Sequence, residues 1–121
     1  MLSDTQNSHN IIGSDEVEGT AVYAVDGRHI GSVNKLLIEK TSGRVTDAVL
    51  SVGGLFGLGS KMHSMPWPKL EYDTDLRGYR LDVTEDALKN APTFSDEDAG
   101  DIYTADYQSG VYDYWGVERR W

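Results

Sequence analysis

Cysteine is absent from the 121 residues, so the chain can form neither a disulfide nor a thiolate metal site. Long apolar runs are missing as well. The longest, such as Leu36-Leu37-Ile38, are far shorter than the roughly 20 residues that a membrane-spanning helix needs. Residues 1–10 are polar and lack the apolar core of a secretory signal. We therefore expect a cytoplasmic protein with no membrane insertion.

Basic charge is also scarce. The formal net charge is −9, and residues 1–19 carry four acidic and no basic side chains. Residues 20–94 carry nine of each, and residues 95–121 carry seven acidic and two basic side chains. The middle of the chain is thus neutral between two acidic flanks. Because nucleic acids and anionic membranes attract basic surfaces, we predict no nucleic-acid partner.

The length allows one domain with a modest core. Residues 1–15 are polar and acidic, and we expect a flexible lead-in whose first apolar anchor is Ile11-Ile12. Residues 16–94 contain the β-type runs and form the predicted domain. Residues 95–121 differ in composition, being acidic and rich in aromatic side chains, and are treated as a C-terminal extension.

Short β-type runs and turn signals alternate through the domain. Asp26-Gly27 and Thr41-Ser42-Gly43 are typical of tight hairpins, and Gly31 is typical of a bulge that bends a sheet. In the third run, the alternation predicts Ala48, Leu50 and Val52 on the inner face. A fourth run ends at Pro66 and two shorter runs follow. Thr84 is the expected N-cap of a short helix. The sequence predicts a mainly β fold, a small antiparallel barrel of about six strands with this helix.

A glycine-rich loop lies between the third and fourth runs. It lacks the Gly-Lys-Ser/Thr order and the following helix of a phosphate-binding loop, so we interpret it as a barrel corner. Its apolar residues Leu55, Phe56 and Leu58 either fold back onto the barrel or form a contact patch. A small-ligand- or ion-sensing role for this loop and the nearby carboxylates is the alternative function.

The C-terminal extension carries six of the chain's twelve aromatic residues. Tyr103, Tyr107, Val111 and Tyr114 follow a helical spacing, and Ser95 with the acids after it is the expected helix start. Ser109-Gly110 would kink or end that helix. Such a tail packs either on its own barrel, on a sister subunit or on a foreign partner. The candidate interaction residues outside the glycine loop are Trp67, Tyr103, Tyr107, Tyr114, Trp115 and Trp121.

Signs of catalysis or metal binding are weak. His9, His29 and His63 share no ligand spacing, and no Gly-x-Ser-x-Gly elbow is present. Asp73-Thr74-Asp75 opens like a calcium loop, but Arg77 stands where an oxygen ligand is needed. We expect a protein that is not an enzyme and uses no cofactor and no metal.

Several motifs in order resemble those of the PRC-barrel family. They are Val25-Asp26-Gly27-Arg28-His29-Ile30-Gly31, then Gly43-Arg44-Val45, the loop of residues 53–59, and Met65-Pro66-Trp67. That family includes the cytoplasmic domain of the photosynthetic reaction-centre H subunit, the C-terminal domain of the ribosome maturation factor and stand-alone bacterial proteins. Neither the membrane helix of the first nor the extra barrel of the second is expected here.

The resemblance implies a β-barrel that acts through protein–protein contact, with no catalytic residue to carry over. We therefore expect a bacterial adaptor that self-associates, as a homodimer or larger homo-oligomer, or docks on an assembly whose components the sequence does not name. The motif positions are interpreted as structural, and they are Asp26, Gly27, Gly31, Gly43, Gly53, Gly54, Gly57, Gly59 and Pro66.

Overall fold

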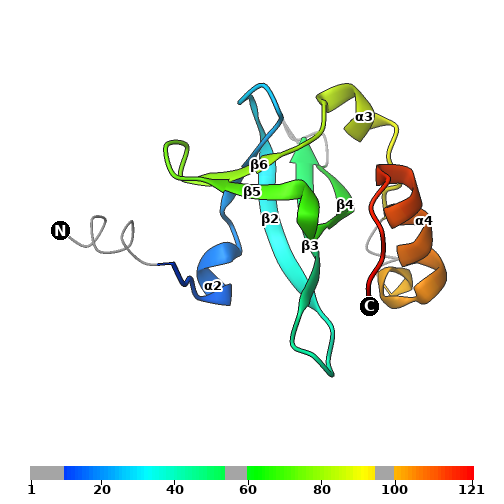
Figure 1. Cartoon of the computed structure of the whole chain (residues 1–121). Coiled ribbons are helices and arrows are strands. Elements are labelled where there is room, and N and C mark those ends of the chain that lie inside the picture. The colour runs from blue at the N-terminus through cyan, green and yellow to red at the C-terminus, as the bar shows by residue number, and fades with distance from the viewer. Residues whose placement is uncertain (1–9, 54–59, 95–99) are drawn as a thin grey trace.

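The computed structural model describes residues 10–53, 60–94 and 100–121. Within them, six strands form one curled sheet in the order β4-β3-β2-β1-β6-β5 (Figure 1). The strands are β1 (Ala21–Tyr23), β2 (His29–Ile38), β3 (Val45–Gly53), β4 (Ser60–Pro66), β5 (Leu70–Asp73) and β6 (Gly78–Leu81). The expected mainly β fold is confirmed.

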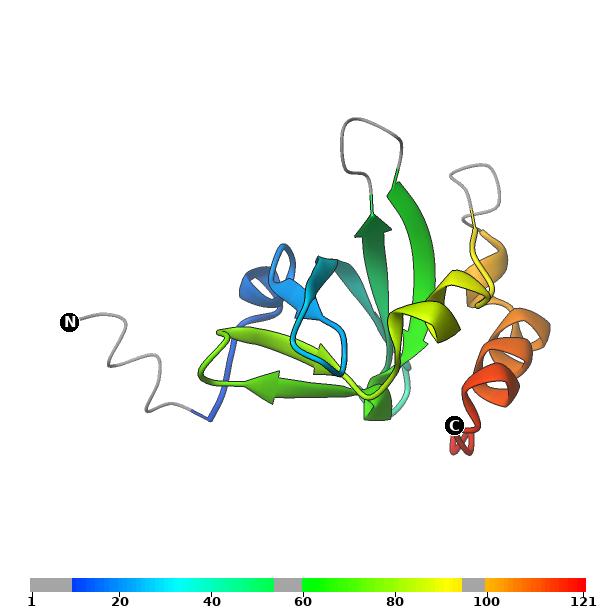
Figure 2. The same cartoon turned by 90° about the horizontal axis from the view of Figure 1, so that it is seen from above.

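Short helices surround this sheet. They are α2 (Ser14–Val17), α3 (Glu85–Lys89) and α4 (Ala105–Trp115), with the 3-10 turns η2 (Trp67–Lys69) and η4 (Asp101–Tyr103). Figures 1 and 2 both place α2 on one side of the sheet and α4 on the other, beside β4. α2 was not predicted. Its Val17 is the buried anchor of the N-terminal region, whereas Ile11 is 88% exposed, so the expected anchor at Ile11-Ile12 was wrong.

The sheet is a half-barrel whose two edge strands, β4 and β5, follow each other in the chain. No ladder joins β4 to β5 among the described strands, and η2 connects them instead. The prediction of a wholly antiparallel sheet was wrong in one pairing, because Val22 and Tyr23 of β1 pair in parallel with Tyr79 and Arg80 of β6. The chain reverses direction at each antiparallel connection, from β1 to β2, β2 to β3, β3 to β4 and β5 to β6. It passes from β4 to β5 through η2 without such a reversal. β6 therefore returns in the same direction as β1.

The predicted turns and cap are present. β1 and β2 form an antiparallel hairpin around Gly27, which has a φ of +89°. β2 and β3 form the next around Gly43, with a φ of +75°. Asp26 accepts the backbone N–H of Arg28 at 3.0 Å. Thr84 Oγ1 accepts the Ala87 N–H at 3.1 Å and so caps α3 as predicted. β4 ends at Pro66 and Gly53 has a φ of +82°, but Gly54, Gly57 and Gly59 lie outside the described residues.

Gly31 has a different role from the predicted one. The register shifts from Val22–Gly31 to Tyr23–His29, so the residue that bulges is Ile30, next to Gly31. Gly31 is required for another reason. A Cβ atom at this position would lie 2.0 Å from the carbonyl oxygen of Ser51 on β3. The glycine therefore permits two strands to approach closely.

Replacing Gly31 with Ala is expected to lower the free energy of unfolding by at least about 2 kcal/mol, because the backbone of β3 would have to shift. Urea unfolding of the purified variant measures this loss. Gly100→Ala is the matched control, since nothing lies within 4 Å of a Cβ built at that position. It should change stability by less than about 0.5 kcal/mol. Equal stability of the two variants would refute the close approach.

The core has two parts. The main cluster fills the concave side of the sheet and includes Val22, Leu50, Leu81 and Leu88. A smaller cluster, Leu37, Val49, Phe94 and Ile102, lies on the opposite face. The predicted inner residues Ala48 and Leu50 are fully buried and Val52 packs on the main cluster, but Asp47 and Val49 on the other face of β3 are fully buried too. The outer face is therefore covered by η4 and by the start of α4 rather than exposed to solvent, while Val111, Tyr112 and Trp115 of α4 belong to the main cluster.

The helix of the extension differs from the prediction in its start, its end and its buried face. α4 begins at Ala105, with Thr104 accepting the Tyr107 N–H at 3.2 Å, and not at Ser95. Gly110 lies inside the helix, which ends at Gly116 in the left-handed conformation. The buried side chains are Gln108, Val111, Tyr112 and Trp115. Of the predicted stripe of Tyr103, Tyr107, Val111 and Tyr114, Val111 alone is fully buried. The side of α4 that packs on the sheet is instead the one that carries Gln108, Tyr112 and Trp115.

Candidate functional site

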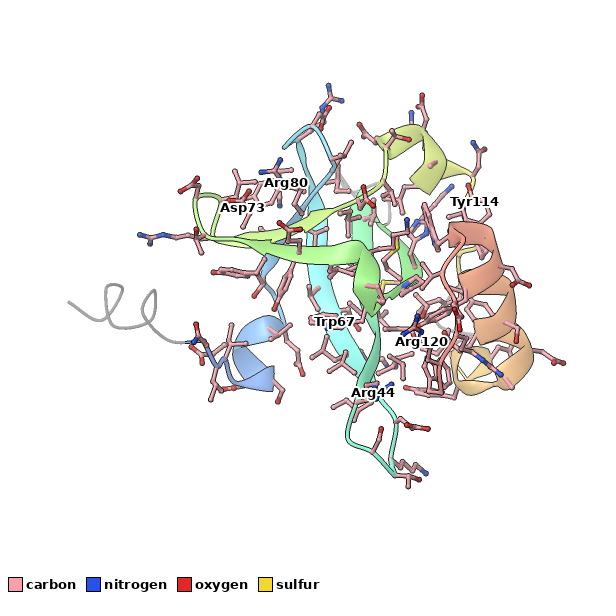
Figure 3. All side chains as sticks on the ribbon, in the orientation of Figure 1. Arg44, Trp67, Asp73, Arg80, Tyr114 and Arg120 are labelled. Carbon is pink, nitrogen blue, oxygen red and sulfur yellow. The ribbon has the colours of Figure 1, made fainter. Side chains whose placement is uncertain are left out.

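An apolar groove of about 440 Å³ opens at the end of the sheet where β3 begins and β4 ends. The C-terminal residues return past α4 and form its second wall. Figure 3 labels Arg44, Trp67 and Arg120, which come from these three parts of the chain. Three aromatic residues line this groove, namely Trp67, Tyr112 and Trp121, and the remaining lining residues are Arg44, Val45, Thr46, Pro68, Val117, Glu118 and Arg120. We call it the aromatic groove.

Ring contacts and hydrogen bonds hold the aromatic groove in shape. Tyr112 lies edge-to-face with Trp121 at a centroid distance of 5.9 Å and accepts the Trp121 Nε1–H at 3.3 Å. The Tyr112 hydroxyl donates to the carbonyl of Thr46, and burial raises the pKa of Tyr112 to about 12. Trp67 packs against Tyr79 of the main core at 5.6 Å. The groove thus has a fixed floor and two half-buried tryptophans.

The charged residues of the groove are mostly basic, in contrast to the chain as a whole. Arg44 and Arg120 are both exposed. Arg120 lies 3.8 Å from Glu118, with three quarters of each side chain exposed, which is a weak surface pair. The guanidinium of Arg119 lies over the ring of Trp121 at 5.0 Å, where it adds positive charge beside the groove.

Of the predicted interaction residues that the structure describes, Trp67 and Trp121 line the aromatic groove, and Tyr103, Tyr107, Tyr114 and Trp115 lie elsewhere. Tyr103 is 63% exposed and accepts a hydrogen bond from Lys35 Nζ at 2.9 Å, while Tyr107 packs edge-to-face on Phe94. Tyr114 donates to the carbonyl of Ala87 at 2.6 Å, which ties α4 to α3. Trp115 is buried, and Leu55, Phe56 and Leu58 lie outside the described residues.

The other members of the groove were not predicted from the sequence. Tyr112 lies off the predicted helical stripe, and Arg44 and Arg120 stand in no motif with a binding role. The groove depends on a long-range contact, because Tyr112 reaches the backbone of Thr46 from the far end of the chain. Only the folded structure shows that residues 44–46, 67–68 and 112–121 share one surface.

A buried polar cluster lies between β3, β4 and α4. Ser64 Oγ donates to Asp47 Oδ2 at 3.0 Å, and Gln108 Nε2 donates to Ser64 Oγ at 3.2 Å and to the Ile102 carbonyl at 2.7 Å. Asp47 Oδ1 and Gln108 Oε1 are buried with no hydrogen-bond partner among the described residues. Burial raises the pKa of Asp47 from 3.8 to about 6. The cluster fixes the position of α4 at a cost in desolvation.

Two further titratable groups, His63 and Asp73, are held by contacts within the fold. Burial lowers the pKa of His63, and its ring hydrogen-bonds to the backbone of Pro92. A hydrogen bond from Arg80 lowers the pKa of Asp73, so the apparent calcium loop begins with a carboxylate already paired. Within residues 10–53, 60–94 and 100–121, no three His, Asp or Glu side chains are placed to hold a metal ion.

The family model described as the PRC-barrel domain matches residues 9–88. That is more than half of the chain. The chain belongs to the PRC-barrel domain family. A search of curated proteins found no match to it. In the part of the chain that the structure describes, no helix has the length and apolar character needed to cross a membrane.

The aromatic groove lies across the boundary of this PRC-barrel match. Arg44 and Trp67 belong to the matched segment, whereas Tyr112, Arg120 and Trp121 belong to the extension beyond residue 88. The groove is therefore not a property of the PRC-barrel domain by itself. It forms because α4 packs on the sheet and brings the C-terminal residues back beside η2.

Proposed function

We propose that this chain is a non-catalytic protein–protein interaction module of the PRC-barrel type and that the aromatic groove is its docking surface. The observation that carries the proposal is the pairing of two half-buried tryptophans with exposed arginines in one groove. Tryptophan, tyrosine and arginine dominate the binding energy of protein interfaces, and a groove of this size accepts one or two side chains of a partner. A bacterial, cytoplasmic setting is part of the proposal and rests on the sequence alone.

The two buried titratable side chains, Asp47 and His63, support a non-enzymatic role. Asp47 is enclosed beneath α4 and His63 is buried against the backbone of Pro92, so neither faces a substrate-sized space. The ligand-sensing alternative depends on the glycine loop, of which residues 54–59 lie outside the described residues. No observation on the residues that the structure describes favours it.

A Trp121→Ala variant tests the docking role. Trp121 is half-buried, and its ring contacts Tyr112 of the groove and the neighbouring Arg119, so the fold should survive its loss. We expect affinity purification from the source lysate to recover the partner set of the full chain at least tenfold less efficiently, because an aromatic anchor contributes about 2 kcal/mol or more.

Tyr103→Ala is the matched control, since this exposed aromatic lies outside the groove. It should retain the partners. Light scattering of the same variants shows whether a recovered partner is a further copy of the chain. Equal recovery by the full chain and both variants would contradict docking through the groove.

A further inference from the structure

We propose that the aromatic groove of one copy binds the acidic segment of residues 11–18 from a second copy. This inference rests on the proposed function and names the partner of the same surface. It joins the groove, with its exposed arginines, to an acidic segment that displays an unused apolar side chain.

The groove supplies positive charge that the fold does not use. The side chain of Arg44 has no ion pair or hydrogen bond with any described residue, and Arg120 has only its long contact with Glu118. Elsewhere Arg28 pairs with Glu85 at 3.1 Å and Arg80 pairs with Asp73. A guanidinium left exposed beside an apolar groove is well suited to a carboxylate, because it can donate two parallel hydrogen bonds.

The segment of residues 11–18 supplies the complementary features. Ile11 is 88% exposed and Ile12 is 46% exposed, and no other large apolar side chain among the described residues is as exposed as Ile11. Asp15 and Glu18 follow at exposed positions and form no ion pair with the described residues. An apolar anchor followed within a few residues by carboxylates matches a groove whose tryptophans lie beside arginines.

A copy's own segment cannot fill its own groove. Val17 is buried in the main core and fixes α2 in place, while Figures 1 and 2 show α2 and the C-terminal end on opposite sides of the sheet. Because the two surfaces face apart on one molecule, a contact between them requires two molecules. Reciprocal docking would close a dimer, and head-to-tail docking would give longer chains.

Charge reversal on each side, followed by their combination, tests the contact. Sedimentation equilibrium of the full chain is expected to show concentration-dependent self-association. Arg44→Glu with Arg120→Glu should weaken the dissociation constant at least tenfold, and Asp15→Arg with Glu18→Arg should do the same. An equimolar mixture of the two double variants should associate within about threefold of the unmodified chain, because the reversed groove then meets a reversed segment and the native groove meets a native segment.

Two controls separate this contact from general charge effects. Lys89→Glu lies at an exposed position on α3, away from the groove, and changes the net charge by half as much as the two arginine reversals together. It should leave association unchanged. Ile11→Asn should weaken association without changing net charge. A synthetic peptide of residues 10–18 should compete with self-association, whereas a peptide in which Ile11 and Ile12 are Asn should not.

A monomeric chain at concentrations up to about 1 mM would overturn the inference. So would self-association that the arginine reversals leave unchanged, or a mixture that fails to recover. The docking role would survive each of these results if Trp121→Ala still lost a foreign partner. If neither the recovery of partners nor self-association changed when the groove residues were replaced, both proposals would be overturned.

Discussion

Replacing Asp47 with Asn is expected to stabilise the protein above pH 6 by up to about 3 kcal/mol and to have little effect near pH 4. The carboxyl of Asp47 is fully buried, and its pKa rises from 3.8 to about 6 in the folded state. The folded chain thus binds this proton more tightly than the unfolded chain does. The stabilisation that comes from binding this proton is fully present below pH 4 and is lost as the pH rises through 6. Since one pKa unit corresponds to about 1.4 kcal/mol, the whole change is about 3 kcal/mol.

Urea unfolding of both proteins between pH 4 and pH 8 measures the effect as a difference. The difference is needed because the lowered pKa of His63 acts in the opposite sense, adding stability that is lost as the pH falls below 6.5. That contribution is shared by both proteins and cancels. Tyr112, which also faces Asp47, does not titrate in this range. Parallel stability curves for the two proteins would show that Asp47 is not buried as described.

Replacing Val111 with Asp should lower the free energy of unfolding by about 4 kcal/mol or detach α4 from the sheet, because a charge would replace a side chain that is 1% exposed. Urea unfolding measures the first outcome. Hydrogen exchange of α4 and the fluorescence of the buried Trp115 report the second.

Gly110→Asp is the matched control for this substitution. It places the same charge one residue earlier in α4, at an exposed position where nothing lies within 4 Å of a Cβ. It should change stability by no more than about 0.5 kcal/mol. If Val111→Asp were equally harmless, the extension would not pack on its own domain, and the aromatic groove would not form within one chain.

Features that depend on neighbouring residues could be predicted from the sequence. The Asp26-Gly27 hairpin needs only the backbone freedom of one glycine, and the Thr84 cap needs only a hydroxyl three residues before a free N–H. The order of such signals was enough to predict the mainly β fold and the resemblance to the family that residues 9–88 match.

Features that depend on distant residues could not be predicted. The alternation of residues along the third strand placed Asp47 and Val49 on the outer face of the sheet. No residue near them in the sequence indicated that this face would be covered, yet both are fully buried. The buried side of α4 includes Gln108, a polar residue that no apolar stripe predicts. The aromatic groove has the same origin, since Thr46 and Tyr112 become neighbours only after the extension has packed.

The parallel contact between β1 and β6 constrains the order in which the chain can assemble. The β2–β3–β4 meander joins segments adjacent in sequence, so its loops are short and their closure entropy is small. Val22 reaches Tyr79 only across the whole meander, η2 and β5. We therefore expect the β2–β3–β4 meander to form first and the β1–β6 contact to form last.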